Sequence, residues 1–187
     1  MPLPARTRTL YEAIESLPEG VTGEIIRGQL HTQPRPGGPH AIAGSNLGAE
    51  LLPPYGRGRG GPGGWWIIDE PEIHFIRDTE ILVPDLAGWR RERMPALPSD
   101  QRFEVVPDWV CEILSPGTAS KDRDVKMPVY AEWGVAYAWL VDPAEQALEA
   151  YTLRHGEWAR TARFAGEALV SAPPFEAARF VVADLWR

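Results

Sequence analysis

Asp108-Trp109-Val110-Cys111-Glu112-Ile113-Leu114 is the stretch that decides the fold, because it is a nearly continuous apolar run that only Glu112 interrupts. A short apolar run of this kind is typical of a strand at the centre of a sheet, buried on both faces. An ionised carboxylate in such a place is costly unless a cation compensates its charge. The stretch therefore predicts a core strand and a charged partner for Glu112.

The residues that follow predict a strand, helix, strand unit. Residues 118–133 support a helix that Gly134 closes, and residues 136–141 form a second apolar strand. Two strands joined in this way are expected to be parallel, with a right-handed crossover. Pro128 complicates the helix, since it lacks an N–H and disfavours helix at the preceding residue. We expect the helix to kink there, or to begin later and leave Lys126 in its first turn.

The N-terminal half predicts shorter elements. Residues 9–17 have helical spacing, residues 24–27 and 29–32 form a hairpin around Gly28, and residues 40–52 form a helix that Pro53 and Pro54 stop, before a glycine-rich loop at 55–64. Residues 65–68 and 72–77 are predicted to pair with each other, residues 85–89 form a further strand, and the 90–107 loop follows. Antiparallel strands are expected at 148–153, 157–164 and 180–182. The pattern predicts an α/β fold.

Composition bounds the class of protein. A chain of 187 residues with 44% hydrophobic content suits one domain, residues 1–187. The lone Cys111 allows no intrachain disulfide, which fits the cytoplasm, and we expect it to be a buried, inert thiol. Residues 1–10 carry no apolar targeting segment, and no stretch is long and apolar enough to span a membrane. Most of the eight Trp residues are expected in the core, and any others would form an interface surface.

Net charge argues against a protein that coats nucleic acid, because the formal charge is −7. It argues less strongly against a metal-dependent enzyme, since a bound cation reverses the local field of a carboxylate cluster. Two groups of arginines remain open between phosphate contact and solvated surface charge: Arg57 with Arg59, and Arg90, Arg91 with Arg93.

The residues with chemical potential are Asp85, Glu112 and Lys126. A carboxylate entering one strand and another inside a neighbouring core strand can converge on one hard cation, because Mg²⁺ accepts one or two protein carboxylates. Phosphodiester cleavage adds negative charge at phosphorus, which a metal and an ammonium group neutralise. The set predicts a divalent-metal site that cuts phosphodiester bonds, with Asp85 and Glu112 as metal ligands.

Other residues are expected to support this set. Asp122, Lys126 and Tyr130 are four residues apart on the predicted helix, so Asp122 should orient Lys126 through an i, i+4 pair. Glu24 is a candidate third ligand or orienting base, with a solvent-facing strand position as the alternative. Ser115 and Thr118 are candidates for contacts around the ligands, although a turn and a helix cap explain them equally well. His40 is left outside the set, since helix capping or solvent exposure explains it as well as phosphate contact.

These motifs resemble the Uma family of putative restriction endonucleases, and the resemblance covers most of the chain. It is carried by residues 23–28, His40, Pro84-Asp85, residues 112–116, Asp122, Lys126, Tyr130 and Gly134-Val135. The family is similar to PD-(D/E)XK nucleases, which implies a restriction-endonuclease-like mixed central sheet flanked by helices, here with added antiparallel strands. Leu114 stands where the wider superfamily has its lysine. The resemblance implies that the lysine has moved to Lys126, and Lys121 is the alternative.

Two functions follow as hypotheses. The first is a Mg²⁺- or Mn²⁺-dependent endonuclease with DNA as the default substrate, using Asp85, Glu112, Lys126 and Glu24, and working as a homodimer because double-strand cleavage needs two sites. The second is a catalytically silent nuclease fold that binds nucleic acid or a protein partner in a mobile-element or defence system. A serine or cysteine hydrolase finds little support, since the sequence has no G-x-S-x-G motif.

Overall fold

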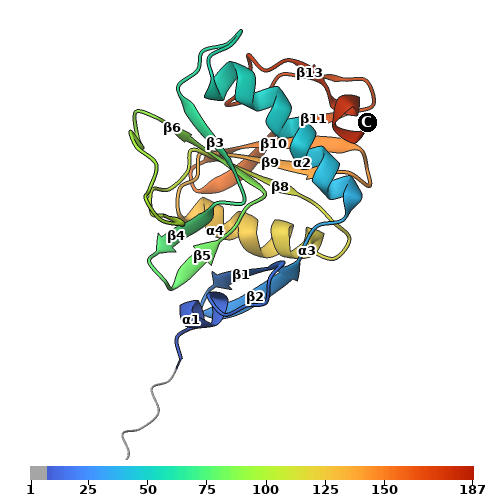
Figure 1. Cartoon of the computed structure of the whole chain (residues 1–187). Helices are drawn as coiled ribbons and strands as arrows, with labels where there is room; N and C mark the ends of the chain where they lie inside the picture. The colour runs from blue at the N-terminus through green and yellow to red at the C-terminus, as the bar shows by residue number, and fades with distance from the viewer. Residues whose placement is uncertain (1–7) are drawn as a thin grey trace, which may run out of the picture.

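A six-stranded sheet forms the centre of the molecule in the computed structural model, which describes residues 8–187 (Figure 1). Its strand order is β11-β10-β9-β8-β6-β3, with bounds β11 Glu157–Ala165, β10 Ala147–Arg154, β9 Tyr137–Asp142, β8 Trp109–Ile113, β6 Leu86–Arg90 and β3 Trp65–Asp69. β8 and β9 are parallel, as the sequence predicts, and the other pairs of this sheet are antiparallel. The expected mixed central sheet is therefore confirmed.

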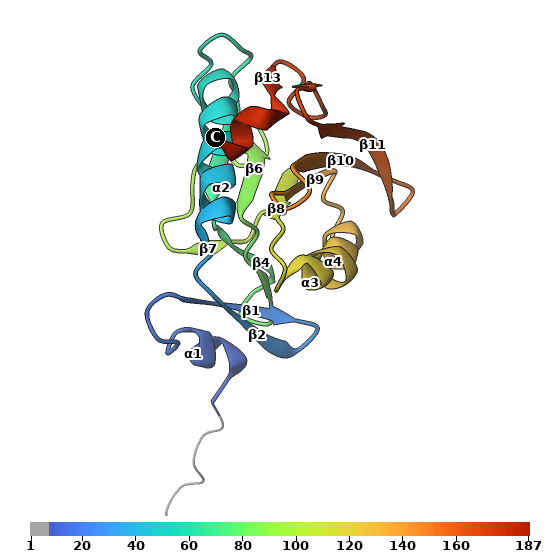
Figure 2. The same cartoon turned by 90° about the vertical axis from the view of Figure 1, so that its right-hand side faces the viewer.

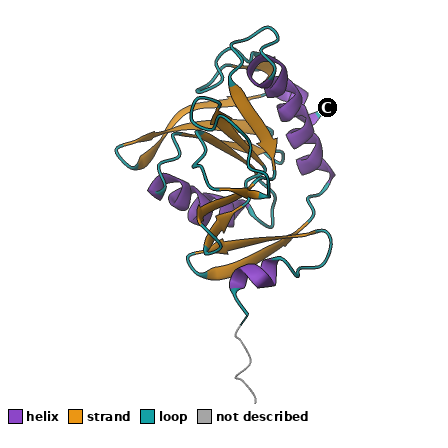
Figure 3. Cartoon of the chain, turned by 60° about the vertical axis from the view of Figure 1, so that its left-hand side comes forward, coloured by secondary structure: helices purple, strands orange, loops and turns teal. Residues whose placement is uncertain are grey.

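Side chains of β8 alternate between two hydrophobic clusters, because successive strand residues point to opposite faces. Trp109, Cys111 and Ile113 pack with the helix α2 (Gly38–Leu51) and the C-terminal segments. Val110 and Leu114 pack with the helix α4 (Met127–Glu132). Figures 2 and 3 show these helices on opposite sides of the sheet. Glu112 therefore points toward the α4 side.

The helix between β8 and β9 is continuous but not uniform. It begins as α3 (Ala119–Lys121), widens into the π-helical turn η2 (Asp122–Lys126) and continues as α4. In the wide turn, the Met127 N–H donates to the Asp122 carbonyl, five residues back. Pro128 follows this turn, near the start of the regular helix, where a missing N–H is tolerated. Of the two expected outcomes, a kink and a later start, the later start holds only for the regular helix α4, which begins at Met127 with Lys126 as its N-cap. Helical turns precede it, and a π turn accommodates the proline.

The helix α2 also runs through prolines. It begins at Gly38 and ends at Leu51, and the π-helical turn η1 (Leu52–Gly56) carries it through Pro53 and Pro54. The prediction that these prolines stop the helix at Leu52 is correct only for its regular part.

A second sheet has five strands in the order β2-β1-β5-β4-β7. Their bounds are β2 Gln29–Pro34, β1 Val21–Ile26, β5 Glu80–Leu82, β4 Glu72–Ile76 and β7 Arg102–Phe103. The β1–β2 hairpin is confirmed, and its two turn residues, Arg27 and Gly28, have φ of 51° and 74°, as a type I′ turn requires. Helix α4 packs between the two sheets, because its cluster also contains Ile26 and Leu82.

The predicted pairing of residues 65–68 with 72–77 is wrong. β3 pairs with β6 in the first sheet, whereas β4 pairs with β5 in the second. Glu70 has a φ of 43° and is followed by Pro71, so the chain leaves one sheet and enters the other instead of forming a hairpin.

Short elements close both ends. Helix α1 (Leu10–Ile14) begins at Thr9, whose side chain forms a capping box with Glu12. At the other end, β12 (Leu169–Val170) pairs with β13 (Phe180–Val181), and the 3-10 helix η3 (Val182–Trp186) lies against α2. Residues 1–7, part of the segment predicted to lack an apolar targeting sequence, lie outside the described residues.

Four of the eight Trp residues are buried and the other four are half-buried, so none is fully exposed. Cys111 is fully buried, as predicted, and burial raises the pKa of its thiol well above the ordinary value. Within residues 8–187, no helix has both the length and the apolar character needed to cross a membrane.

Candidate active site

Asp85 lies just before β6, where two backbone groups of neighbouring strands meet it. Its Oδ2 accepts a hydrogen bond from the Ile113 N–H at 2.6 Å, and its carbonyl accepts one from the Glu70 N–H at 3.0 Å. Its Oδ1 lies 3.1 Å from His40 Nε2. The end of β8 and the first turn of α2 therefore fix the orientation of this carboxylate.

Glu112 lies on the α4 face of β8 and has 2% of its surface exposed. The Lys126 ammonium lies 2.9 Å from Oε1 and 3.0 Å from Oε2. The Tyr130 hydroxyl donates to Oε1 at 2.5 Å. The charged partner that the sequence requires for Glu112 is Lys126, and the helix supplies a second donor one turn later.

Glu24 joins the same network from the middle of β1, and it is as buried as Lys126. Its Oε1 accepts from the Val83 N–H at 2.9 Å and lies 2.9 Å from Lys126 Nζ. Its Oε2 accepts from Lys121 Nζ at 2.8 Å. Both lysines thus hold Glu24, which is not a solvent-facing strand residue.

The two lysines differ in their access to solvent. Lys126 has 1% of its surface exposed, and its three donors reach Glu24, Glu112 and the Val83 carbonyl. The Lys121 side chain is 19% exposed and uses two donors, on Glu24 and on Gln33. Lys121 lines a cleft of about 280 Å³ that Asp85 and Glu112 also line. Of the two ammonium groups, that of Lys121 faces the space open to a substrate.

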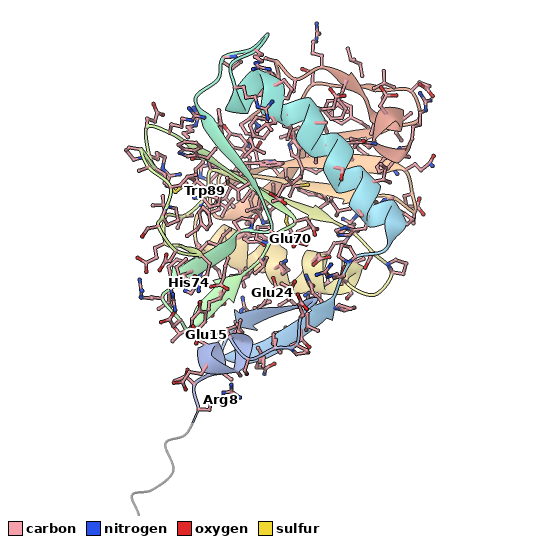
Figure 4. The ribbon with its side chains drawn as sticks, viewed as in Figure 1. Arg8, Glu15, Glu24, Glu70, His74 and Trp89 are labelled. Atoms are coloured by element: carbon pink, nitrogen blue, oxygen red, sulfur yellow. The ribbon has the colours of Figure 1, made fainter. Side chains whose placement is uncertain are left out.

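The cleft lies between the β1–β2 hairpin, the segment that enters α2, and the end of β8. Its other lining residues include Thr22, Thr32, Arg35, Gly37, His40, Glu70, Ser115, Thr118 and Asp122. Figure 4 labels Glu24 and Glu70, which lie in the middle of the molecule, between the hairpin and α2 in that view.

Ionisation in this cluster is strongly coupled. Burial raises the pKa of Glu112 well above its ordinary value; Lys126 opposes this, and nearby carboxylates, Asp122 first, add to it. Burial alone would raise the pKa of Glu24, but Lys126 and Lys121 outweigh burial and hold it below its ordinary value. Burial alone would lower the pKa of Lys126, but the charges of Glu112 and Glu24 outweigh burial and raise it. The environment of Lys126 therefore favours its charged form.

The cluster has an excess of negative charge when its six groups are ionised. They are the carboxylates of Glu24, Asp85, Glu112 and Asp122 and the ammonium groups of Lys121 and Lys126. Four negative and two positive charges leave two negative charges uncompensated. Nothing else among the described ion pairs of these residues offsets them except a protonated His40.

Asp122 does not form the predicted pair with Lys126, since no ion pair joins the two side chains among the described residues. Lys126 points instead to Glu112 and Glu24, which are closer partners in the core. The Asp122 carboxylate accepts a hydrogen bond from Thr118, and burial raises the pKa of Asp122. The Thr118 hydroxyl also lies 3.0 Å from that of Ser115. Ser115 and Asp122 thus line the cleft near the ligands rather than contact them.

His40 belongs to the site, although the set predicted from the sequence did not include it. It does not cap α2, whose N-cap is Gly37, and its ring faces Asp85. Burial alone would lower the pKa of His40, but the hydrogen bond to Asp85 and the charge of Asp85 raise it. Two signals in the sequence pointed to it, its place beside the Pro/Gly break and its place among the residues that carry the family resemblance, but neither predicts a contact between residues 45 positions apart.

The arginines at the end of β6 and just after it have structural partners. Arg93 pairs with Asp108 at 2.8 Å, Arg90 lies over the Trp65 ring, and Arg91 lies over the Trp66 ring. These contacts favour a structural role over the phosphate contact that the sequence left open for them.

Comparison with known proteins identifies the family. A family model named Uma2 and described as "Putative restriction endonuclease" matches residues 9–183. The chain belongs to the Uma2 family. A solved structure described as a putative nuclease belonging to DUF820, from Anabaena variabilis ATCC 29413, is similar to this Uma2 protein with a TM-score of 0.74 and 25% identity, over 95% of this chain and 97% of that one. No curated protein matches the chain by sequence. Both descriptions support a nuclease function.

Proposed function

We propose that this Uma2 protein is a Mg²⁺- or Mn²⁺-dependent endonuclease that hydrolyses phosphodiester bonds in DNA. The observation that carries the proposal is the buried network of Glu112, Lys126 and Glu24, which adjoins Asp85 at a cleft and, when all its carboxylates are ionised, carries two more negative than positive charges. A divalent cation is the simplest group that offsets such an excess. A carboxylate in a cleft whose pKa is perturbed by burial and by a specific charged partner marks a candidate functional site.

Asp85 and Glu112 are the residues that would hold the cation. Both are hard oxygen donors that line the cleft, and Mg²⁺ needs only one or two protein carboxylates. Within residues 8–187, no group of three or more His, Cys, Asp or Glu side chains is arranged to hold a metal ion, so waters and substrate oxygens would complete its ligands. When bound, the metal neutralises charge at the phosphate and lowers the pKa of a water.

The chain's own groups orient these ligands. Lys126 and Tyr130 fix the Glu112 carboxylate, whereas His40 and the Ile113 N–H fix that of Asp85. We keep Lys126 in the catalytic set as the cation that balances Glu112, with Glu24 holding both lysines. Lys121 has one donor left beyond Glu24 and Gln33, and this donor is available for a substrate phosphate.

A charge-neutral variant of Asp85 tests the proposal. Asp85→Asn should lower the rate of plasmid nicking in Mn²⁺ roughly 100-fold or more, as the loss of a main electrostatic element does. Asp184→Asn serves as the matched control, because Asp184 lies in η3 and contacts Arg187 rather than the cleft. Nicking should also stop in chelator. Equal nicking by Asp85→Asn and by the wild type would contradict the proposed mechanism.

The second hypothesis, a catalytically silent nuclease fold, makes a different prediction in the same assay. If the wild type shows no nicking in Mg²⁺ or Mn²⁺ but still binds an oligonucleotide, the fold acts without catalysis.

Homodimerisation remains a prediction from the need for two sites in double-strand cleavage, and sedimentation of the purified protein tests it.

A further inference from the structure

A second hollow adjoins the cleft on the far side of Asp85. It has a volume of about 440 Å³ and lies between α2 and the ends of β3, β6 and β8. The two hollows share His40, Glu70, Asp85 and Ile113 among their lining residues. Whatever occupies the second hollow is therefore directly adjacent to the proposed site of cleavage.

One wall of this hollow is a flat face of α2. Ala41, Gly44, Ser45 and Gly48 line it, so the helix presents little more than backbone. A Cβ added at Gly44 would lie 3.0 Å from Ile113 Cδ1, whereas a Cβ at Gly48 would meet nothing within 4 Å. The helix thus packs closely on β8 at Gly44 and leaves open space beside Gly48.

The opposite wall is apolar. Ile67 of β3, Leu86 of β6 and Ile113 of β8 contribute to it, together with Leu52 after α2. A helix face of small residues and an apolar sheet face suit a ring that packs between them. The volume lies in the range of small-ligand sites, which are mostly apolar with few polar groups.

Charge separates the two hollows. No Lys or Arg of the described chain lines the second hollow, while Asp69, Glu70 and Asp85 do. The carboxylates of Asp69 and Glu70 have no hydrogen-bond or ion-pair partner within residues 8–187. Arg35 and Lys121 line only the first cleft. With the proposed metal bound, the first cleft has cations that a phosphate can contact, whereas the second has none and offers acceptors to N–H donors.

We propose that the second hollow receives one unpaired nucleobase of the substrate, beside the scissile phosphate in the first cleft. This inference rests on the proposed nuclease function and names its substrate class: nucleic acid with an unstacked base next to the cut. Carboxylates accept hydrogen bonds from the exocyclic amino groups of cytosine, adenine and guanine. A base inside the duplex cannot enter such a hollow, so single-stranded or bulged substrates avoid the cost of unpairing.

Gly48→Leu fills the hollow and tests the proposal. Gly48 is helical and a Cβ added there would meet nothing within 4 Å, so we expect leucine to extend into the hollow and to improve helix propensity. Ala49→Leu is the matched control, because Ala49 is the next residue of the same helix and is exposed. Both variants should melt at or above the wild-type temperature.

The first readout is cleavage. Wild type and Ala49→Leu should cleave single-stranded DNA about tenfold faster than the paired duplex of the same sequence, as expected from the energy of one base contact. Gly48→Leu should lose most of this preference while still nicking plasmid. A Gly48→Leu variant with the wild-type preference, or a wild type that prefers paired duplex, would overturn the inference.

The second readout does not depend on cleavage. A short single-stranded oligonucleotide with one 2-aminopurine should change its fluorescence on binding to wild type and Ala49→Leu, but not to Gly48→Leu. If the wild type cleaves nothing and this difference persists, the nuclease proposal fails and the base site stands. If the wild type cleaves but both leucine variants give the same fluorescence, the base site fails and the nuclease proposal stands. Absence of any oligonucleotide binding by the wild type would also overturn the base site.

Discussion

At the scale of single residues, the site contains two lysines with different surroundings. Lys126 is enclosed by Glu112, Glu24 and the Val83 carbonyl, so its charge balances carboxylates inside the core. Lys121 shares Glu24 with it but faces the cleft. A buried ion pair adds little net stability, yet removal of one partner is costly because the other charge stays buried.

Substitution of each lysine by methionine should separate these roles. Lys126→Met should lower the free energy of unfolding by about 3–5 kcal/mol, since Glu112 and Glu24 lose their shared cation. Lys121→Met should lower it by about 1 kcal/mol or less, because the Lys121 side chain is partly solvated. Urea denaturation measures both values.

The same pair should differ in DNA binding. Lys121→Met should reduce the slope of log affinity against log salt by roughly one, as the loss of one phosphate contact does. Arg8→Met is a control from outside the cleft lining. Equal stability losses for the two lysine variants, or an unchanged salt slope for Lys121→Met, would contradict this division of roles.

The sequence identified the partners of Glu112 but not the whole site. Helical spacing placed Lys126 and Tyr130 on one stripe, and both contact Glu112. The expected Asp122–Lys126 pair was wrong because a distant residue, Glu24, binds the same ammonium group. The contact of His40 with Asp85 depends on how α2 docks on the sheet, which no local pattern encodes.

The helix from Ala119 to Glu132 is the element that carries the site, and sheet contacts fix its wide turn. Arg123 Nη1 lies 2.8 Å from Glu149 Oε2 on β10, and the Trp158 indole N–H donates to the Met127 carbonyl at 2.8 Å. π turns cost backbone regularity and are frequent at functional sites. These two contacts hold the turn against β10 and β11.

Glu149→Gln should weaken this docking in a pH-dependent way. Burial alone would raise the pKa of Glu149, but hydrogen bonds from Arg123 and Tyr151 and the arginine charges outweigh burial and lower it. A lowered carboxyl pKa contributes stability above the unfolded-state pKa, and this stability is lost as pH falls through the folded-state pKa.

The variant should therefore be less stable than the wild type at pH 7 by about 0.5–1 kcal/mol, a small value because the arginines are partly exposed. The difference should shrink at acidic pH, below the ordinary glutamate pKa. Urea denaturation at neutral and at acidic pH measures it, and a difference that grows on acidification would contradict the assignment.

At the scale of helices and strands, the sequence predicted most elements, but it predicted one strand pairing wrongly. Apolar runs gave β8 and β9 as neighbouring parallel strands, because their burial on both faces suppresses alternation. The separation of β3 from β4 depends on Glu70 and Pro71, whose backbone turn sends the chain to another sheet. Pro53, Pro54 and Pro128 were expected to stop or kink helices, and π turns accommodate them.

The whole molecule places one site where two sheets approach each other. Glu24 comes from the five-stranded sheet and Glu112 from the six-stranded sheet, while α4 and the η2 turn pack between them (Figure 1). Neither sheet alone contains both carboxylates. The composition of the sequence could not reveal this arrangement, because it depends on contacts between residues far apart in the chain.

The central claim is that Asp85 and Glu112 bind one divalent metal at the cleft. Crystals soaked in Mn²⁺ and measured at a wavelength with manganese anomalous signal test it most directly. We expect one anomalous peak within coordination distance of a carboxylate oxygen of Asp85 and of Glu112, and no such peak in Asp85→Asn crystals. A fully soaked wild-type crystal with no peak at these two carboxylates, or with the peak unchanged in Asp85→Asn, would contradict the account.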